Sequence, residues 1–246
     1  MTGGAHTSIA WGPAAGHSCP SPIAGIDPGT RRLSARLSSR LLGRRISRSR
    51  SLRLRSWPVK EYYARRVAEY EATSWEAFDP SECEAVERFV ASLPRGRILD
   101  IGCGTGYLTR LLRGRLVALD QSSEMLALAR ARVPGAEFVH ADVPPLPFPD
   151  GAFDLAFSSN VYSHIETAAA RAEFVAETLR VARALVVLEQ AWRPGRERES
   201  WELRRLLDGS EHRVFKRYLT AEELARELDG AVVLASAEFI AVRAPA

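Results

Sequence analysis

Three carboxylates and a glycine-rich loop are the residues of this 246-residue sequence whose types and spacing could bind a ligand. Each acidic residue ends a short apolar run: Asp100, Asp120 and Asp142. The glycines stand at alternating positions directly after the first acid: Gly102, Gly104 and Gly106. A backbone without Cβ atoms can turn sharply and approach a ligand closely. Asp120 lies about as far beyond the glycine loop as the carboxylate that accepts hydrogen bonds from both ribose hydroxyls in nucleotide-binding βαβ units. The pattern therefore predicts a nucleoside-type cofactor.

The spacing of the glycines and the acids favours a cationic cofactor over a dinucleotide. The loop reads G-x-G-x-G, whereas the dinucleotide fingerprint is G-x-G-x-x-G. Carboxylates at successive strand ends would also repel a pyrophosphate. An NAD-dependent oxidoreductase on a related fold is therefore the alternative that this spacing disfavours.

The elements that must position these residues alternate along the chain. Apolar runs of the buried parallel type predict strands over residues 97–101, 116–120, 137–142, 155–157 and 184–189. Further strands over 232–235 and 239–242 are expected to close the chain as an antiparallel hairpin. Helices are predicted over residues 61–71, 80–93, 122–133, 167–183 and 197–207. Another is predicted to begin at residue 108 and to stop at Gly114. The last is predicted to run from Thr220, which forms a capping box with Glu223, to Gly230.

Two stretches of the chain resemble a known family. Asp100 to Gly106, D-I-G-C-G-T-G, resembles the first motif of class I S-adenosylmethionine-dependent methyltransferases. Leu146 to Asp154, L-P-F-P-D-G-A-F-D, is similar to the segment before the fourth strand in the type 11 group of these enzymes. The resemblance spans about residues 62–244 and is best defined over 97–166. It implies an α/β fold: a Rossmann-like, seven-stranded, mostly parallel sheet with helices on both faces and an antiparallel last strand. The family's usual Pro-Gly turn before the fifth strand is absent here.

The resemblance also implies which residues hold S-adenosylmethionine. The amino acid end would be held by Asp100 and the glycine loop, namely Gly102, Cys103, Gly104 and Gly106. The ribose would be bound by Asp120, with Gln121 and Met125 nearby. The adenine would be flanked by Ala141, Asp142 and Val143, and the methionine side by Ser159 and Asn160. Cys103 has no base partner in the sequence, so a catalytic thiol is not expected.

Methyl transfer from a sulfonium needs mainly that donor and acceptor be held in attack geometry. His164, in the loop after the fourth strand, could act as a general base for the acceptor, or could simply line the pocket. Weaker candidates are Tyr62, Tyr63, Tyr162 and His212. A tyrosine-bearing segment before the first strand could cover the site or pack on the sheet edge. The acceptor is expected to be a small molecule that the sequence does not identify.

Charge separates the chain into two parts. Ten arginines and no acidic residue lie between Arg31 and Arg55, although the whole chain has a net charge of only +4. Residues 1–56 are therefore expected to be a disordered extension, with a transit peptide or an RNA- or membrane-binding arm as alternatives. Residues 57–246 are expected to form one domain: helices over 57–94, a cofactor-binding core over 95–190, and C-terminal helices and a hairpin over 191–246.

The charge after residue 60, the cysteines and the length of the apolar runs each exclude a class of protein or site. The part after residue 60 is net acidic, so no stable nucleic-acid partner is expected for it. The three cysteines show no zinc-type spacing, and no metal site is expected. Reduced thiols suggest the cytoplasm, and no run of apolar residues is long enough to span a membrane. The third possibility is a non-enzymatic protein that binds S-adenosylmethionine or associates with RNA through its arginine-rich arm.

Overall fold

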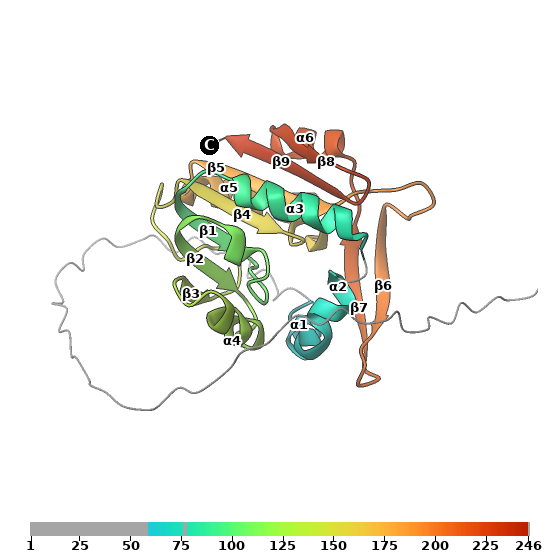
Figure 1. The fold of residues 1–246 in the computed structure, drawn as a ribbon. Helices are drawn as coiled ribbons and strands as arrows, with labels where there is room; N and C mark the ends of the chain where they lie inside the picture. The colour runs from blue at the N-terminus through green and yellow to red at the C-terminus, as the bar shows by residue number, and fades with distance from the viewer. Residues whose placement is uncertain (1–58, 76–77, 246) are drawn as a thin grey trace, which may run out of the picture. The chain divides into compact units, whose positions relative to one another are not determined.

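The computed structural model describes residues 59–75 and 78–245, and a seven-stranded sheet lies at its centre (Figure 1). Its strands are β1 Gly96–Ile101, β2 Gly114–Asp120, β3 Glu137–His140, β4 Leu155–Ser159, β5 Ala184–Gln190, β8 Ala231–Ala235 and β9 Phe239–Pro245. They are ordered β3-β2-β1-β4-β5-β9-β8. Neighbours among β1 to β5 are parallel, and β9 is antiparallel to both β5 and β8. The predicted fold class is confirmed. The predicted N-terminal extension lies outside the described residues.

Helices cover both faces of this sheet. On one face lie α3 (Pro80–Ser92) and α4 (Ser123–Arg132), and on the other lie α5 (Ala168–Val181) and α6 (Ala221–Leu228). Because successive side chains of a strand point to opposite faces, Ile98 packs with the α3 cluster and Leu99 with the cluster of α5 and α6. Each of these helices begins with a side-chain cap: Asp79, Ser122, Thr167 and Thr220. The capping box of Thr220 and Glu223 is present as predicted.

The helix predicted to begin at Leu108 is wrong. Only a single 3₁₀ turn, Thr109–Leu111, follows the glycine loop, and the backbone is already extended at Leu112. The reason is that Gly114 begins β2, which leaves too few residues for a helical crossover. Leu108 and Leu112 still bury their side chains in the cluster beneath α3.

The helix predicted over residues 197–207 is also wrong. The segment is strand β6 (Glu199–Arg205), which pairs antiparallel with β7 (Glu211–Arg217) in a separate two-stranded sheet. Trp201 and Leu203 alternate with polar residues, which is the strand period, and a turn at Asp208 and Gly209 follows. The helix-favouring composition of the segment was outweighed by these two signals. The C-terminal part thus contains one helix, α6, and two hairpins.

The segment before α3 contains α1 (Lys60–Arg66), the 3₁₀ turn Val67–Glu69 and α2 (Tyr70–Ser74), and its first part packs against this hairpin. Val59 and Tyr62 form a small core with Leu206 and Val214 of the hairpin. Figure 1 shows α1, α2 and the hairpin beyond the ends toward which β2 and β4 point. The tyrosine-bearing segment is therefore positioned at the carboxyl ends of the parallel strands.

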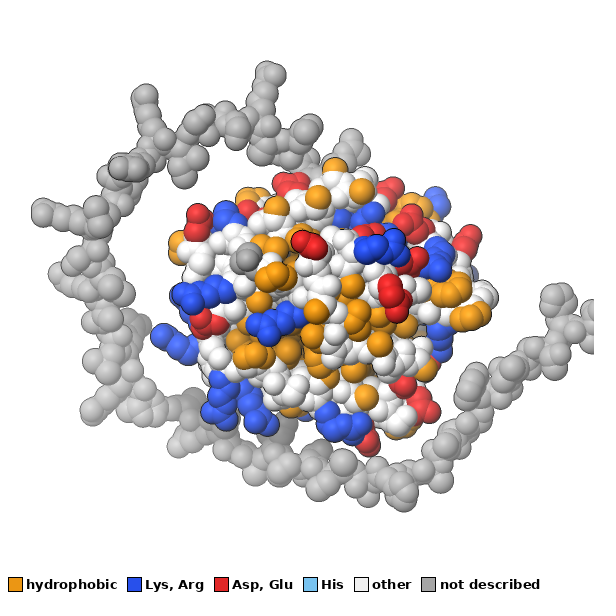
Figure 2. Space-filling model, turned by 90° about the horizontal axis from the view of Figure 1, so that it is seen from above, with side chains coloured by type: hydrophobic (Ala, Val, Ile, Leu, Met, Phe, Trp, Pro, Cys, Tyr) orange, Lys and Arg blue, Asp and Glu red, His pale blue; other side chains and the backbone are white. Residues whose placement is uncertain are grey.

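Charged side chains of both signs lie on the surface of the described part of the chain. On the face seen in Figure 2, basic and acidic side chains are interspersed around a central area that is largely apolar. Within residues 59–75 and 78–245, no helix is long and apolar enough to cross a membrane. The same residues bring together no cluster of three or more His, Cys, Asp or Glu side chains that could hold a metal ion.

Candidate functional site

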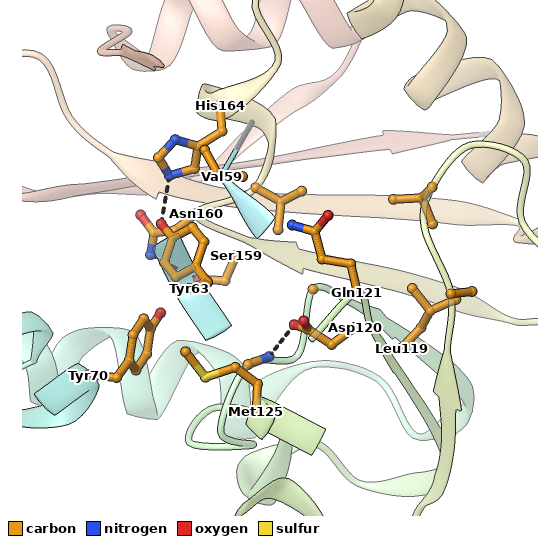
Figure 3. Close-up of a pocket in the computed structure, with 15 residues that line it drawn as sticks. Val59, Tyr63, Tyr70, Leu119, Asp120, Gln121, Met125, Ser159, Asn160 and His164 are labelled. Carbon is orange, nitrogen blue, oxygen red and sulfur yellow. Dashed lines mark hydrogen bonds between the residues drawn. The ribbon is translucent and has the colours of Figure 1, made fainter. Parts of the chain in front are cut away.

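A cavity lies at the carboxyl ends of β1, β2 and β4, where the strand order reverses and open α/β sheets bind their ligands. It contains about 650 Å³ of space, including its open mouth. Figure 3 shows Asp120, Gln121 and Met125 on one side of this central cavity, with Tyr63 and His164 across from them. Its walls thus come from the sheet, from α4 and from the segment before β1.

Most residues predicted to hold a cofactor line this central cavity. They are Gly102, Gly104, Asp120, Gln121, Met125, Ala141, Val143, Ser159 and Asn160. His164 lines it too. The structure therefore brings together residues that the sequence distributes over the ends of four successive strands and the turn into α4.

The glycine loop turns between β1 and the cavity with a left-handed backbone. Gly102 has a φ of +72°, and a Cβ atom there would lie 2.3 Å from Cγ2 of Val161. Only glycine can occupy this position without moving the loop after β4. The Gly104 N–H donates to the carboxylate of Asp120 at 2.9 Å, so the loop and the second strand end are fixed together.

The carboxylate of Asp120 is nearly buried and held in a defined orientation. Oδ2 accepts from the Gly104 N–H, and Oδ1 accepts from the Ser122 N–H at 2.8 Å. Burial raises the pKa of this carboxyl above its usual value, and the backbone hydrogen bonds oppose that shift. A ligand hydroxyl that donates to Asp120 would replace part of the hydration that this carboxylate loses on burial. The site therefore suits a diol.

Asp100 and Cys103 line a smaller inner cavity that shares Gly102 and Gly104 with the central one. Asp100 is buried and accepts a 2.6 Å hydrogen bond from the Thr109 hydroxyl. Burial raises the pKa of Asp100 to about 7, and the nearby charge of Asp120 adds to the shift. Burial also raises the pKa of the Cys103 thiol, which leaves it a poor nucleophile.

Two residues predicted for the cofactor lie outside both cavities. Asp142 is exposed and pairs with Lys60, 3.2 Å away, while its neighbours Ala141 and Val143 line the central cavity. Gly106, with a φ of +77°, packs against α4: a Cβ atom there would lie 3.2 Å from Ala129. The geometry gives Gly106 a place in helix packing and Asp142 a place in a surface ion pair.

Asn160 stands where three cavities meet. It lines the central cavity, the inner cavity and a third one described below. Its φ of +55° is unusual for a residue with a side chain and marks a strained position at the end of β4. Its buried Oδ1 has no hydrogen-bond partner among the described residues, so it can accept from a bound ligand.

His164 is buried and makes two hydrogen bonds. Its Nδ1 lies 2.7 Å from the carbonyl oxygen of Phe215, which can only accept, so Nδ1 carries a proton. Nε2 then accepts from the Tyr63 hydroxyl at 2.9 Å in the neutral ring. Burial and the positive charges of Lys216, Arg204 and Arg66 hold the pKa of His164 well below its usual value. The ring is therefore neutral at pH 7, and Tyr63 stands beside it in the cavity wall.

Several lining residues carry no signal in the sequence. The apolar side chains of Val59, Leu119 and Val161 carry no chemical signature, and Tyr70 stood out only as part of a tyrosine-bearing segment. That segment is tied to the glycine loop through Glu71, which accepts from the Thr105 hydroxyl at 2.8 Å and binds Arg132 on α4.

Comparison with known proteins agrees with this geometry. Residues 99–186 match the family described as a methyltransferase domain. The chain is 32% identical over 158 residues to a malonyl-[acyl-carrier protein] O-methyltransferase of Serratia marcescens, covering 63% of this chain and 60% of that protein. It is 33% identical over 109 residues to a trans-aconitate 2-methyltransferase of Rhizobium rhizogenes, covering 39% of this chain and 42% of that protein. The matched segments thus span less than two thirds of these curated relatives.

The similarity to solved structures covers a larger share of this chain. A DhpI-SAM-HEP complex superimposes with a TM-score of 0.64 at 28% identity, covering 76% of this chain and 96% of the other. A DhpI-SAH complex has a TM-score of 0.62 at the same identity.

Proposed function

We propose that this chain, whose core is a class I S-adenosylmethionine-dependent methyltransferase domain, transfers a methyl group from S-adenosylmethionine to a small-molecule acceptor. The observation that carries the proposal is the convergence of the glycine loop and the Asp120 carboxylate in one cavity with Met125 and Ala141. The relatives named for trans-aconitate support a small molecule as acceptor, and the two DhpI complexes support the cofactor.

Each wall of the cavity suits one part of the cofactor. Asp120 would accept from the ribose hydroxyls, and the backbone at Ala141 and Val143 would flank the adenine. Asp100, below the glycine loop, would face the cationic amino acid end from the inner cavity. Ser159 and Asn160 would lie along the methionine side. This assignment leaves Asp142 and Gly106 in supporting roles outside the cavity.

The residues of the chain would contribute mainly by positioning. The cofactor, when bound, supplies an electrophilic methyl group on a sulfonium. The acceptor atom forms a bond to that carbon as the carbon–sulfur bond breaks, and the sulfur takes the bonding electron pair and becomes neutral. An O–H or N–H acceptor must also lose a proton. An O–H acceptor becomes strongly acidic as its oxygen takes the methyl group, so even the weakly basic Nε2 of His164 can take a proton from it through the Tyr63 hydroxyl.

The cofactor class is tested by titrating the purified chain with S-adenosylmethionine and, separately, with NAD in a calorimeter. We expect saturable binding of S-adenosylmethionine and none of NAD, because the strand-end carboxylates repel a pyrophosphate. Asp100 adds a pH dependence: its carboxyl is mostly protonated below about pH 7 and ionised above it. Affinity for the cationic ligand should therefore fall as pH drops through 7, and Asp100→Asn should remove that dependence. Tighter binding of NAD would contradict the proposal.

The proton path is tested with Tyr63→Phe, assayed by transfer of a labelled methyl group to an acceptor found in a metabolite screen. We expect turnover to fall by about two orders of magnitude, the usual contribution of acid–base catalysis, at unchanged affinity for S-adenosylmethionine. His164→Ala should have the same effect. Tyr70→Phe is the matched control, because Tyr70 lines the same cavity without bonding to His164. Full turnover by Tyr63→Phe would leave both residues with only a packing role.

We further propose that residues 57–246 form the functional unit, in the cytoplasm, and that the arginine-rich segment before it is dispensable for cofactor binding. The mildly acidic composition after residue 60 supports this division. An RNA-associated role for the arm remains the second candidate, resting on its ten arginines between Arg31 and Arg55.

A further inference from the structure

A second chamber adjoins the central cavity. The assignments proposed above for the cofactor and for proton transfer leave it without a ligand. The two share Tyr63, Tyr70, Asn160 and His164, so a molecule in this chamber would lie beside the proposed methyl donor. Its space is about 850 Å³, including the open mouth. We call it the basic chamber because Arg66, Arg204 and Lys216 line it.

The three cations reach the chamber from separate parts of the chain. Arg66 comes from α1, Arg204 from β6 and Lys216 from β7. The guanidinium carbons of Arg66 and Arg204 lie 5.5 and 5.6 Å from the ring centre of Tyr62. All three charges depress the pKa of His164, which lies in the wall that the chamber shares with the central cavity. The hairpin that the sequence analysis missed thus supplies two of the three.

Acidic side chains balance only part of this charge. Arg204 pairs with Glu202 at 2.6 Å, and the buried Lys216 lies 3.7 Å from Glu189. Arg66 donates to Thr73 and Ser74, and no carboxylate lies within ion-pair distance of it in the described part of the chain. Three cations face two carboxylates, so the chamber carries one positive charge in excess while His164 is neutral.

Aromatic side chains form another part of the chamber lining. Trp75 and Phe239 are stacked with ring centres 5.7 Å apart, and Phe78 lies 4.8 Å from Phe239. All three line the chamber. The chamber therefore has a cationic side that suits an anion and an apolar side that suits a hydrocarbon body.

We propose that the acceptor is an amphiphilic organic acid whose singly charged oxyanion is held by Arg66, Arg204 and Lys216 while its apolar body packs on Trp75 and Phe78, which the buried Phe239 supports. The inference rests on the proposed methyltransferase function and specifies the substrate class of that site. Thr73 and Ser74 accept from Nε and Nη2 of Arg66, so its Nη1 group is the one left to donate a charge-assisted hydrogen bond to an oxyanion. Anchoring the acid in the basic chamber leaves the rest of the molecule to reach Tyr63 and Asn160 at the donor side.

The test is a pair of probes that differ only in charge, hexanoate and hexanamide, titrated into the full chain with and without S-adenosylhomocysteine. Hexanoate should bind at least about tenfold more tightly than hexanamide, the value of one charge-assisted hydrogen bond. Arg66→Gln should remove most of that preference, because glutamine keeps hydrogen-bonding capacity toward Thr73 but lacks the charge. Arg66→Lys should retain part of it.

The matched control is Arg88→Gln, which removes the same charge from an exposed pair with Glu84 on α3 and should leave the preference unchanged. Equal affinity for hexanoate and hexanamide, or a preference that survives in Arg66→Gln, would overturn the inference. S-adenosylmethionine affinity, measured on every variant, should not change. A wild-type chain that fails to bind S-adenosylmethionine would refute the proposed function, while the titrations without cofactor would still test the chamber.

Discussion

Asp120→Asn is expected to weaken S-adenosylmethionine binding about 100-fold, the loss of about 3 kcal/mol of hydrogen bonding to a charged group. In the wild type, one carboxylate oxygen accepts from the Gly104 N–H and the other from the Ser122 N–H. Whichever way the amide is oriented, its NH₂ group faces one of these donors and cannot accept from it. The variant therefore loses the charge that would face the ribose and one of the two backbone hydrogen bonds, from either Gly104 or Ser122. Calorimetric titration measures the effect.

Asp142→Asn is the matched control for this prediction. The chemical change is the same, but the Asp142 side chain is 53% exposed and pairs only with Lys60 at the surface. Surface pairs of this kind contribute little, so we expect a change of less than about threefold. Equal losses in the two variants would contradict the division of roles between the two strand-end acids. Wild-type affinity in Asp120→Asn would remove Asp120 from the cofactor site.

Gly114→Ala is expected to destabilise the fold by about 3 kcal/mol or more. Gly114 begins β2 with a φ of +143°, and a Cβ atom there would lie 2.0 Å from the carbonyl oxygen of Gly96. Gly96 is its register partner in β1, so relief of this clash would have to separate two central strands. The midpoint of unfolding in urea should fall accordingly.

Gly135→Ala tests whether the effect belongs to the position rather than to the loss of a glycine. Gly135 lies before β3, and no atom lies within 4 Å of a Cβ atom built on it. We expect its stability to stay within about 0.5 kcal/mol of the wild type, as for most surface changes. A Gly114→Ala variant as stable as Gly135→Ala would show that β1 and β2 can part at this point.

The sequence was sufficient to predict the seven strands of the central sheet, because most of them are apolar runs bounded by turn residues. It did not suffice for every connection, since the helices expected after the glycine loop and over residues 197–207 are absent. It also predicted nine of the residues that line the central cavity, since strand-end residues of a parallel sheet meet at one edge. It was wrong where local signals competed. Residues 199–205 have helix-favouring composition, but the alternation of Trp201 and Leu203 and the turn at Gly209 make them a strand.

Amino-acid sequence alone thus determined the central sheet and most of the residues proposed to hold the cofactor, because a glycine loop and strand-end carboxylates are short-range patterns. Tertiary structure decided which residues are proposed for the acceptor. Tyr63 and His164 are 101 residues apart and meet only because α1 packs on the β6–β7 hairpin. In the sequence Arg66, Arg204 and Lys216 resemble any solvated cations. Burial beside one another, with one charge unbalanced, is what gives them a preference for an anion.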